Sequence, residues 1–146
     1  MATFGIVEFG WAIYGYTTVN NAATEGARRG MVLNRFQAPT GTVAGNAYHT
    51  PGNSTNTYAG SAWSCDTSSY PTIMGRIMCN TGVLDRSRIT VTLTTPQSFP
   101  ANIVVPPSPD QKITVVVQYV YKPLITYPFN FGTSFTMTGR AESYPQ

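Results

Sequence analysis

The sequence predicts an α+β fold in which one long N-terminal helix packs on a small antiparallel sheet of three to four strands. Three observations predict this fold. Residues 4–33 contain no proline and show helical character. Three later stretches alternate apolar and polar residues with the period of a strand. A sheet with one apolar face also needs a cover, and the long helix is the natural candidate.

The first half of this helix is apolar on nearly every side. Between Phe4 and Tyr16 the only charged residue is Glu8, so this half needs a non-aqueous partner all round. About thirteen apolar residues fall short of the roughly twenty that span a bilayer, so we expect the chain to begin partway along a membrane-type helix. The residues assigned to membrane or assembly contacts are Phe4, Ile6, Val7, Glu8, Phe9, Trp11, Ile13 and Tyr14.

The second half of the helix carries a stripe of small side chains. Ala22, Gly26 and Gly30 recur every four residues, which lets another backbone approach closely. Glu25 stands three residues before Arg28, where a weak surface ion pair can form. Because glycine weakens a helix in water, packing must stabilise this one. The residues predicted to pack against the sheet are Val19, Ala23, Gly26, Ala27 and Met31.

A short second helix and the strands follow along the chain. Pro71 suits a first helical position, and apolar residues at one-face spacing come after it, so a helix is predicted over residues 71–79. The strands alternate apolar residues with threonine or other polar residues, which gives each of them one buried face and favours an antiparallel meander. The predicted strands are 88–95, 112–122 and 133–144, with a small edge strand at 103–105.

Residues 36–64 carry no charge and are rich in Gly, Asn, Thr, Ser and Tyr. We interpret them as a long loop that covers the sheet or forms a filament surface. Tyrosine among small polar residues is also typical of binding loops, which leaves a receptor-facing role open.

Few residues could support catalysis. His49 is the only histidine, and it lies in the uncharged loop with no carboxylate within fifteen residues. The sequence has no nucleophile motif, phosphate loop or metal-spaced cluster, so we expect no enzymatic activity, no cofactor and no metal. The net charge of +3 is spread without a basic run, which argues against nucleic-acid binding.

Two N-terminal runs resemble a known family. Phe4-Gly-Ile-Val-Glu8-Phe-Gly followed by Asn21-Ala-Ala-Thr-Glu25-Gly-Ala-Arg28-Arg-Gly resembles the start of TadE-like proteins, which are minor pilins of the tight-adherence (Tad or Flp) pilus. The second run is the more specific. The resemblance implies a prepilin-type N-terminus, a hydrophobic helix and a small sheet domain outside the cytoplasm. It also implies that other pilin subunits, the pilus assembly machinery and the membrane are partners, with self-association possible.

Three expectations follow from the resemblance. We divide the chain into residues 1–17, a protruding apolar helix truncated by an expression start at Met1, and residues 18–146, a single α+β domain outside the cytoplasm. The chain is expected in the bacterial inner membrane, anchored by its helix, or in a cell-surface pilus. If Glu8 were the fifth residue of a mature prepilin-type chain, that chain would begin at Phe4, but Thr3 and not glycine precedes Phe4. We therefore interpret Glu8 as an internal glutamate with a partner or near the membrane edge.

Cys65 and Cys79 flank the second predicted helix. Outside the cytoplasm an even cysteine count suggests a disulfide, which would contribute about 3 kcal/mol for a loop of about fifteen residues. Two separate buried thiols are the alternative.

These expectations favour a structural role, that of a TadE-like minor pilin in a tight-adherence pilus. The alternative is an extracellular adhesin or pilus-tip module that recognises a surface or glycan through residues 36–64.

Overall fold

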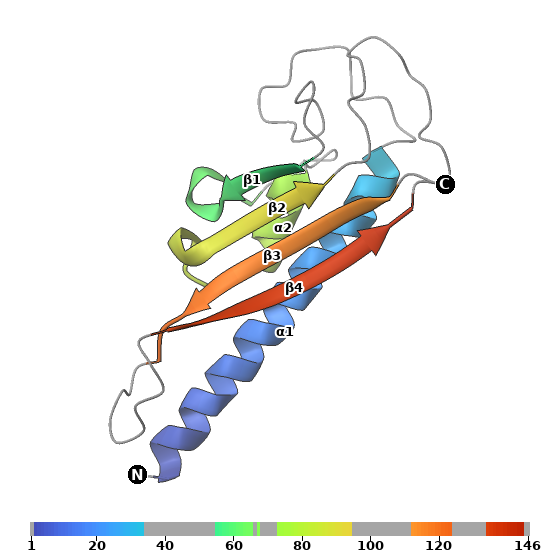
Figure 1. Cartoon of the computed structure of the whole chain (residues 1–146). Helices are drawn as coiled ribbons and strands as arrows, with labels where there is room; N and C mark the ends of the chain where they lie inside the picture. The colour runs from blue at the N-terminus through green and yellow to red at the C-terminus, as the bar shows by residue number, and fades with distance from the viewer. Residues whose placement is uncertain are drawn as a thin grey trace.

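The computed structural model describes residues 2–33, 55–65, 67, 73–94, 112–123 and 134–144. Within these residues a long helix and a short helix lie behind a four-stranded antiparallel sheet (Figure 1). The predicted α+β fold is therefore confirmed. The elements are α1 (Ala2–Leu33), β1 (Thr55–Ala59), the 3₁₀ turn η2 (Gly60–Ala62), α2 (Ile73–Asn80), the 3₁₀ turn η3 (Arg86–Arg88), β2 (Ile89–Thr94), β3 (Ile113–Tyr121) and β4 (Phe135–Ser143).

The sheet has the order β1-β2-β3-β4, so neighbours in sequence are neighbours in space. Three of its strands fall within the predicted segments, and their buried residues alternate as the pattern indicated. In β3 the side chains of Ile113, Val115, Val117, Tyr119 and Tyr121 all lie in the core. Such alternation turns one face of the sheet toward the helices and leaves the other mainly polar.

The first strand, β1, was not predicted from the sequence. Residues 55–59 belong to the stretch predicted as a loop, but they pair antiparallel with β2 from Thr55 opposite Thr94 to Ala59 opposite Thr90. The hydroxyls of Thr57 and Thr92 lie 3.2 Å apart on the outer face. Threonine favours a pleated strand, but without an apolar alternation the segment lacks the usual signal. The edge strand predicted at 103–105 lies outside the described residues.

α2 packs its apolar face into the same core. Ile73, Met74, Ile77 and Met78 are at most 2% exposed. The turn after the helix contains Gly82 at φ 58°, a left-handed conformation that glycine adopts without strain. Cys79 forms a disulfide with Cys65, so the alternative of two separate thiols is wrong.

The second half of α1 approaches the sheet closely. A Cβ added at Gly139 of β4 would lie 2.6 Å from the carbonyl oxygen of Val19, and one at Gly26 would lie 2.7 Å from the side chain of Ile77. Ser143 of β4 donates a buried hydrogen bond of 2.9 Å to the Ala27 carbonyl. Small residues on both sides therefore bring backbone against backbone. The Met31 side chain lies outside the described side chains.

Candidate functional site

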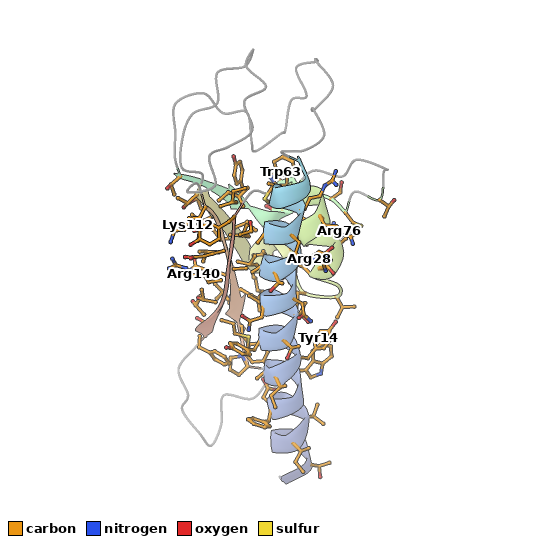
Figure 2. All side chains as sticks on the ribbon, turned by 90° about the vertical axis from the view of Figure 1, so that its right-hand side faces the viewer. Tyr14, Arg28, Trp63, Arg76, Lys112 and Arg140 are labelled. Carbon is orange, nitrogen blue, oxygen red and sulfur yellow. A yellow bond between two sulfur atoms is a disulfide. The ribbon has the colours of Figure 1, made fainter. Side chains whose placement is uncertain are left out.

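The first half of α1 carries large apolar side chains that its own domain leaves exposed. Their exposed fractions run from 43% for Tyr14 to 72% for Ile6. Figure 2 shows this part of the helix extending below the sheet, with side chains on several sides. We call this set the stalk surface, and it consists of Ile6, Val7, Phe9, Trp11, Ile13, Tyr14 and Tyr16.

The exposure follows from helical geometry. At 100° per residue, Glu8, Ala12 and Gly15 lie on the same side of α1 as Val19, and this side faces the sheet. Gly15 is buried against Met137, and Ala12 packs partly on the core. The apolar residues between these positions point elsewhere, so the domain cannot cover them. The sequence analysis included Phe4, whose side chain lies outside the described side chains, and omitted Tyr16.

A shallow open groove crosses the stalk surface. It is lined by Val7, Gly10, Trp11 and Tyr14. The rings of Trp11 and Tyr14 meet edge to face, with centroids 5.8 Å apart. A Cβ added at Gly10 would meet nothing within 4 Å, so the fold itself does not require glycine there. The groove is apolar and offers no group for acid-base chemistry.

Glu8 is turned toward its own domain. The Tyr121 hydroxyl donates a hydrogen bond of 2.6 Å to Glu8 Oε1. Tyr121 is 8% exposed, and burial, followed by the hydrogen bond to Glu8, raises the pKa of its hydroxyl far above the ordinary value. The Phe135 ring packs against the Tyr121 ring, with the two ring centroids 5.0 Å apart. A partner or the membrane edge was expected for Glu8, and its partner within the chain, Tyr121, was not predicted, although a tyrosine at the end of a buried strand face was a usable signal.

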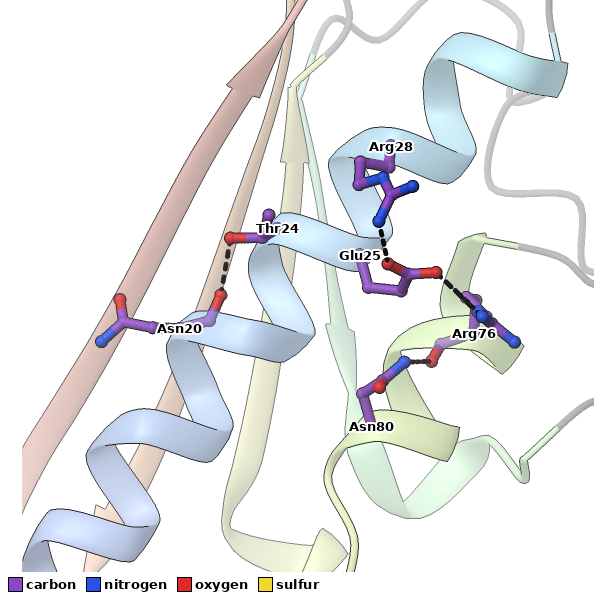
Figure 3. A network of polar contacts seen from close by, with 6 residues as sticks. All are labelled: Asn20, Thr24, Glu25, Arg28, Arg76 and Asn80. Carbon is purple, nitrogen blue, oxygen red and sulfur yellow. Dashed lines mark hydrogen bonds and ion pairs between the residues drawn. The ribbon is translucent and has the colours of Figure 1, made fainter.

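Glu25 joins the two helices (Figure 3). Arg76 of α2 donates to Glu25 Oε1 from Nε at 3.0 Å and from Nη2 at 2.9 Å, while the predicted Arg28 partner lies 3.4 Å from Oε2. Both arginines are well exposed, so these pairs contribute less than about 1 kcal/mol each. The Arg76–Glu25 pair adds a polar contact where α2 packs beside the small-residue half of α1.

The described residues contain no cluster of metal ligands. Among them, no three His, Cys, Asp or Glu side chains lie close enough to hold a metal ion. His49 and residues 36–54 lie outside the described ranges. No helix in the described part of the chain has both the length and the hydropathy needed to cross a bilayer.

The fold and this surface define an α+β protein that displays an apolar helix beyond its own domain. The family model described as TadE-like protein matches residues 1–28. The match confirms the resemblance seen in the sequence, and it covers the whole stalk surface and the Asn21–Arg28 run. Over residues 1–28 the chain is thus similar to TadE-like proteins. Searches of curated proteins and of solved structures found no significant match.

Proposed function

We propose that the protein is a minor pilin of the TadE-like kind, a non-catalytic subunit that joins a tight-adherence pilus. Before assembly its apolar helix anchors it in the bacterial inner membrane, with the sheet domain outside the cytoplasm. Other pilin subunits and the assembly machinery are its partners. The observation that carries the proposal is the stalk surface, a set of large apolar side chains held on a folded helix without cover from their own domain.

The energetics support assembly through this surface. Fully burying a large apolar side chain contributes about 1.5–3 kcal/mol. Seven such side chains lie half exposed or nearly so on one helix, which makes a continuous apolar surface of the kind that marks an interface. Because the rest of α1 is fixed to the sheet, docking need not order the helix first.

The groove at Gly10 favours another helix as the neighbour within the pilus. Helices pack by placing the ridges of one into the grooves of the other. A glycine between larger side chains lowers the surface at that point and permits a close crossing. Val7 and the Trp11–Tyr14 pair form the walls of this low point. We therefore propose that a neighbouring subunit's helix crosses α1 near Gly10.

The test removes apolar side chains from the stalk surface and leaves the residues of the sheet domain unchanged. In the double variant Trp11→Ser with Ile13→Ser we expect the yield of surface pili to fall to the background of a deletion strain, because two of the largest exposed side chains lose their contacts. The melting temperature of the purified protein should stay within the error of the wild type, since both side chains are about half exposed. Normal piliation in this variant would contradict the proposal.

Tyr144→Ser provides the matched control. Tyr144 is 53% exposed but follows the end of β4, where Ser143 contacts Ala27 in the packed half of α1. It should leave pilus yield unchanged, which separates loss of the stalk contacts from a general effect of removing surface apolar groups.

The adhesin hypothesis rests on residues 36–64, most of which lie outside the described ranges. Within that stretch, residues 55–59 form β1. No contact among the described residues favours a glycan site, so this hypothesis remains a prediction that glycan-array binding by the soluble protein can test.

A further inference from the structure

Aromatic and cationic side chains gather where the sheet domain meets the first half of α1. From them we infer a docking surface for the headgroups of an anionic phospholipid bilayer. We call this surface the rim, and it consists of Trp11, Tyr14, Phe135, Arg86 and Lys122. The inference rests on the proposed function only in taking the stalk surface to enter the bilayer before assembly.

The aromatic members lie on two sides of α1. On one side the Tyr121 hydroxyl reaches Glu8, and Phe135, 43% exposed, packs on the Tyr121 ring. On the other side the Tyr14 hydroxyl lies next to the α2–β2 turn, 3.1 Å from where a Cβ would stand on Gly82. The rings therefore surround the helix just where the domain ends and the apolar side chains begin.

The cationic members lie at the same end of the sheet. β2 begins directly after η3, and β3 ends directly before Lys122, with Ile89 paired opposite Tyr119. Figure 1 shows these strand ends on the side of the sheet that faces the N-terminal part of α1. Arg86 and Lys122 therefore lie at the end of the sheet nearest the exposed half of α1.

Asp85 is the acid nearest to these two cations. It pairs with Arg88 at 3.1 Å and accepts from Ser87, and Lys122 is close enough to help lower the pKa of its carboxyl group. Within the described residues, neither Arg86 nor Lys122 forms an ion pair. Arg86, Arg88 and Lys122 outnumber Asp85 at this end of the sheet, which leaves net positive charge for an anion outside the chain.

The chemistry of the rim fits a membrane interface. Tryptophan and tyrosine prefer the headgroup level, where the ring is in an apolar layer and the polar group is wet. Basic residues beside the surface are attracted to anionic lipid. The apolar side chains of Ile6, Val7 and Phe9 continue from the rim toward the helix N-terminus, where acyl chains would lie. A polyanion such as nucleic acid would use the cations but not these apolar groups.

The experiment measures partitioning of the full chain onto vesicles of phosphatidylcholine alone and of an equimolar mixture with phosphatidylglycerol. The variants Lys122→Gln and Arg86→Gln should each lose about fivefold in partitioning onto the anionic vesicles and little on the neutral ones. Lys112→Gln is the control because Lys112 precedes the other end of β3, where it contacts Glu142. It should behave as the wild type. Equal partitioning of the wild type onto both vesicle types, or equal losses in the Lys112 and Lys122 variants, would overturn the inference.

A second measurement locates the rim in the bilayer. The chain has two tryptophans, and Figure 2 places Trp63 near the C-terminal end of α1, far from the labelled Tyr14. The variant Trp63→Phe therefore leaves Trp11 as the only tryptophan. Its fluorescence should be quenched most strongly by lipids brominated near the headgroup. Strongest quenching by bromine at the acyl-chain ends would contradict an interfacial rim, whereas pilus yield tests the proposed function separately.

Discussion

Both halves of α1 contain glycine, but the surroundings of these glycines differ. In the half packed on the domain, a Cβ at Gly26 or Gly30 would come within 2.7 or 3.1 Å of a buried isoleucine. In the exposed half, a Cβ at Gly5 or Gly10 would meet nothing within 4 Å. The glycines of the packed half therefore leave room for buried side chains, while Gly5 and Gly10 in the exposed half make no such room.

This difference separates stability from assembly along one helix. Residues such as Val19, Ala22 and Ala23 are fully buried, so changes there act on the folded domain. Residues of the stalk surface contribute little to the domain because most of their area faces outward. Substitutions in the two halves should thus have separable effects on melting and on piliation.

The largest expected effect concerns the covalent support of the packed half. Replacing both Cys65 and Cys79 with serine should lower the free energy of unfolding by about 3 kcal/mol, because their bond closes a loop of sequence separation 14. Since α2 covers the small-residue stripe, amides of α1 beyond Gly15 should also exchange faster, while those of residues 2–14 should not change. Denaturant unfolding and hydrogen exchange measure the two effects.

The control for the double variant of Cys65 and Cys79 is treatment with a reductant. Reduction should destabilise the wild type and leave the double variant unchanged, and intact mass should show the wild type lighter by a pair of hydrogens before reduction. Free thiols in protein isolated from the periplasm would contradict the prediction.

Overpacking the stripe should have the next largest effect. Gly26→Leu and Ala27→Leu should each lower the free energy of unfolding by about 1–3 kcal/mol, because a bulky side chain pushes α1 away from Ile77 and the sheet. The same change at Gly10 should leave the melting temperature near the wild-type value. If all three variants melt alike, the packed and exposed halves do not differ as described.

Local patterns were sufficient to predict most of the fold. The alternation in residues 88–95, 112–122 and 133–144 identified three strands, because each strand has one face in the core. The long helix was evident from a proline-free segment, and an even number of cysteines in a protein expected outside the cytoplasm suggested the disulfide that the structure contains. The strand and helix signals depend on residues that are close in sequence.

The features that were missed depend on distant residues. β1 needs the edge of β2 to pair with, and its threonines carry no apolar alternation. Arg76 reaches Glu25 only after α2 docks on α1, and Tyr121 reaches Glu8 across 113 residues of sequence. The close approach of Gly139 to α1 was also missed, but here a local signal existed, because an isolated glycine in a strand pattern indicates a close backbone approach.

The contact between Glu8 in the exposed half of α1 and Tyr121 in the sheet should respond to alkaline pH. Burial and the Glu8 hydrogen bond raise the pKa of Tyr121, so the folded state resists ionisation of this hydroxyl. The resulting stability is complete below the ordinary tyrosine pKa of about 10 and is lost as pH rises above it. Tyr121→Phe should lower the free energy of unfolding by about 1 kcal/mol at neutral pH.

The variant should also lose stability less steeply than the wild type above the ordinary tyrosine pKa. Urea unfolding at a series of pH values gives both results, with Tyr144→Phe as the control because Tyr144 is 53% exposed. Parallel pH profiles for Tyr121→Phe and the wild type would show that the Glu8 contact does not form in solution.

The smallest expected effect is a gain in stability, and it tests the difference between the two halves of α1 most directly. Gly10→Ala should stabilise the purified protein by up to about 1 kcal/mol, because alanine favours the helix and its methyl group meets open space. Gly26→Ala should destabilise it, since the new methyl would lie 2.7 Å from the buried Ile77 side chain. Thermal melts of the two variants measure the signs. A loss of stability in Gly10→Ala would mean that the exposed half is packed in solution, and a gain accompanied by reduced piliation would show that the groove is kept open for a neighbouring helix.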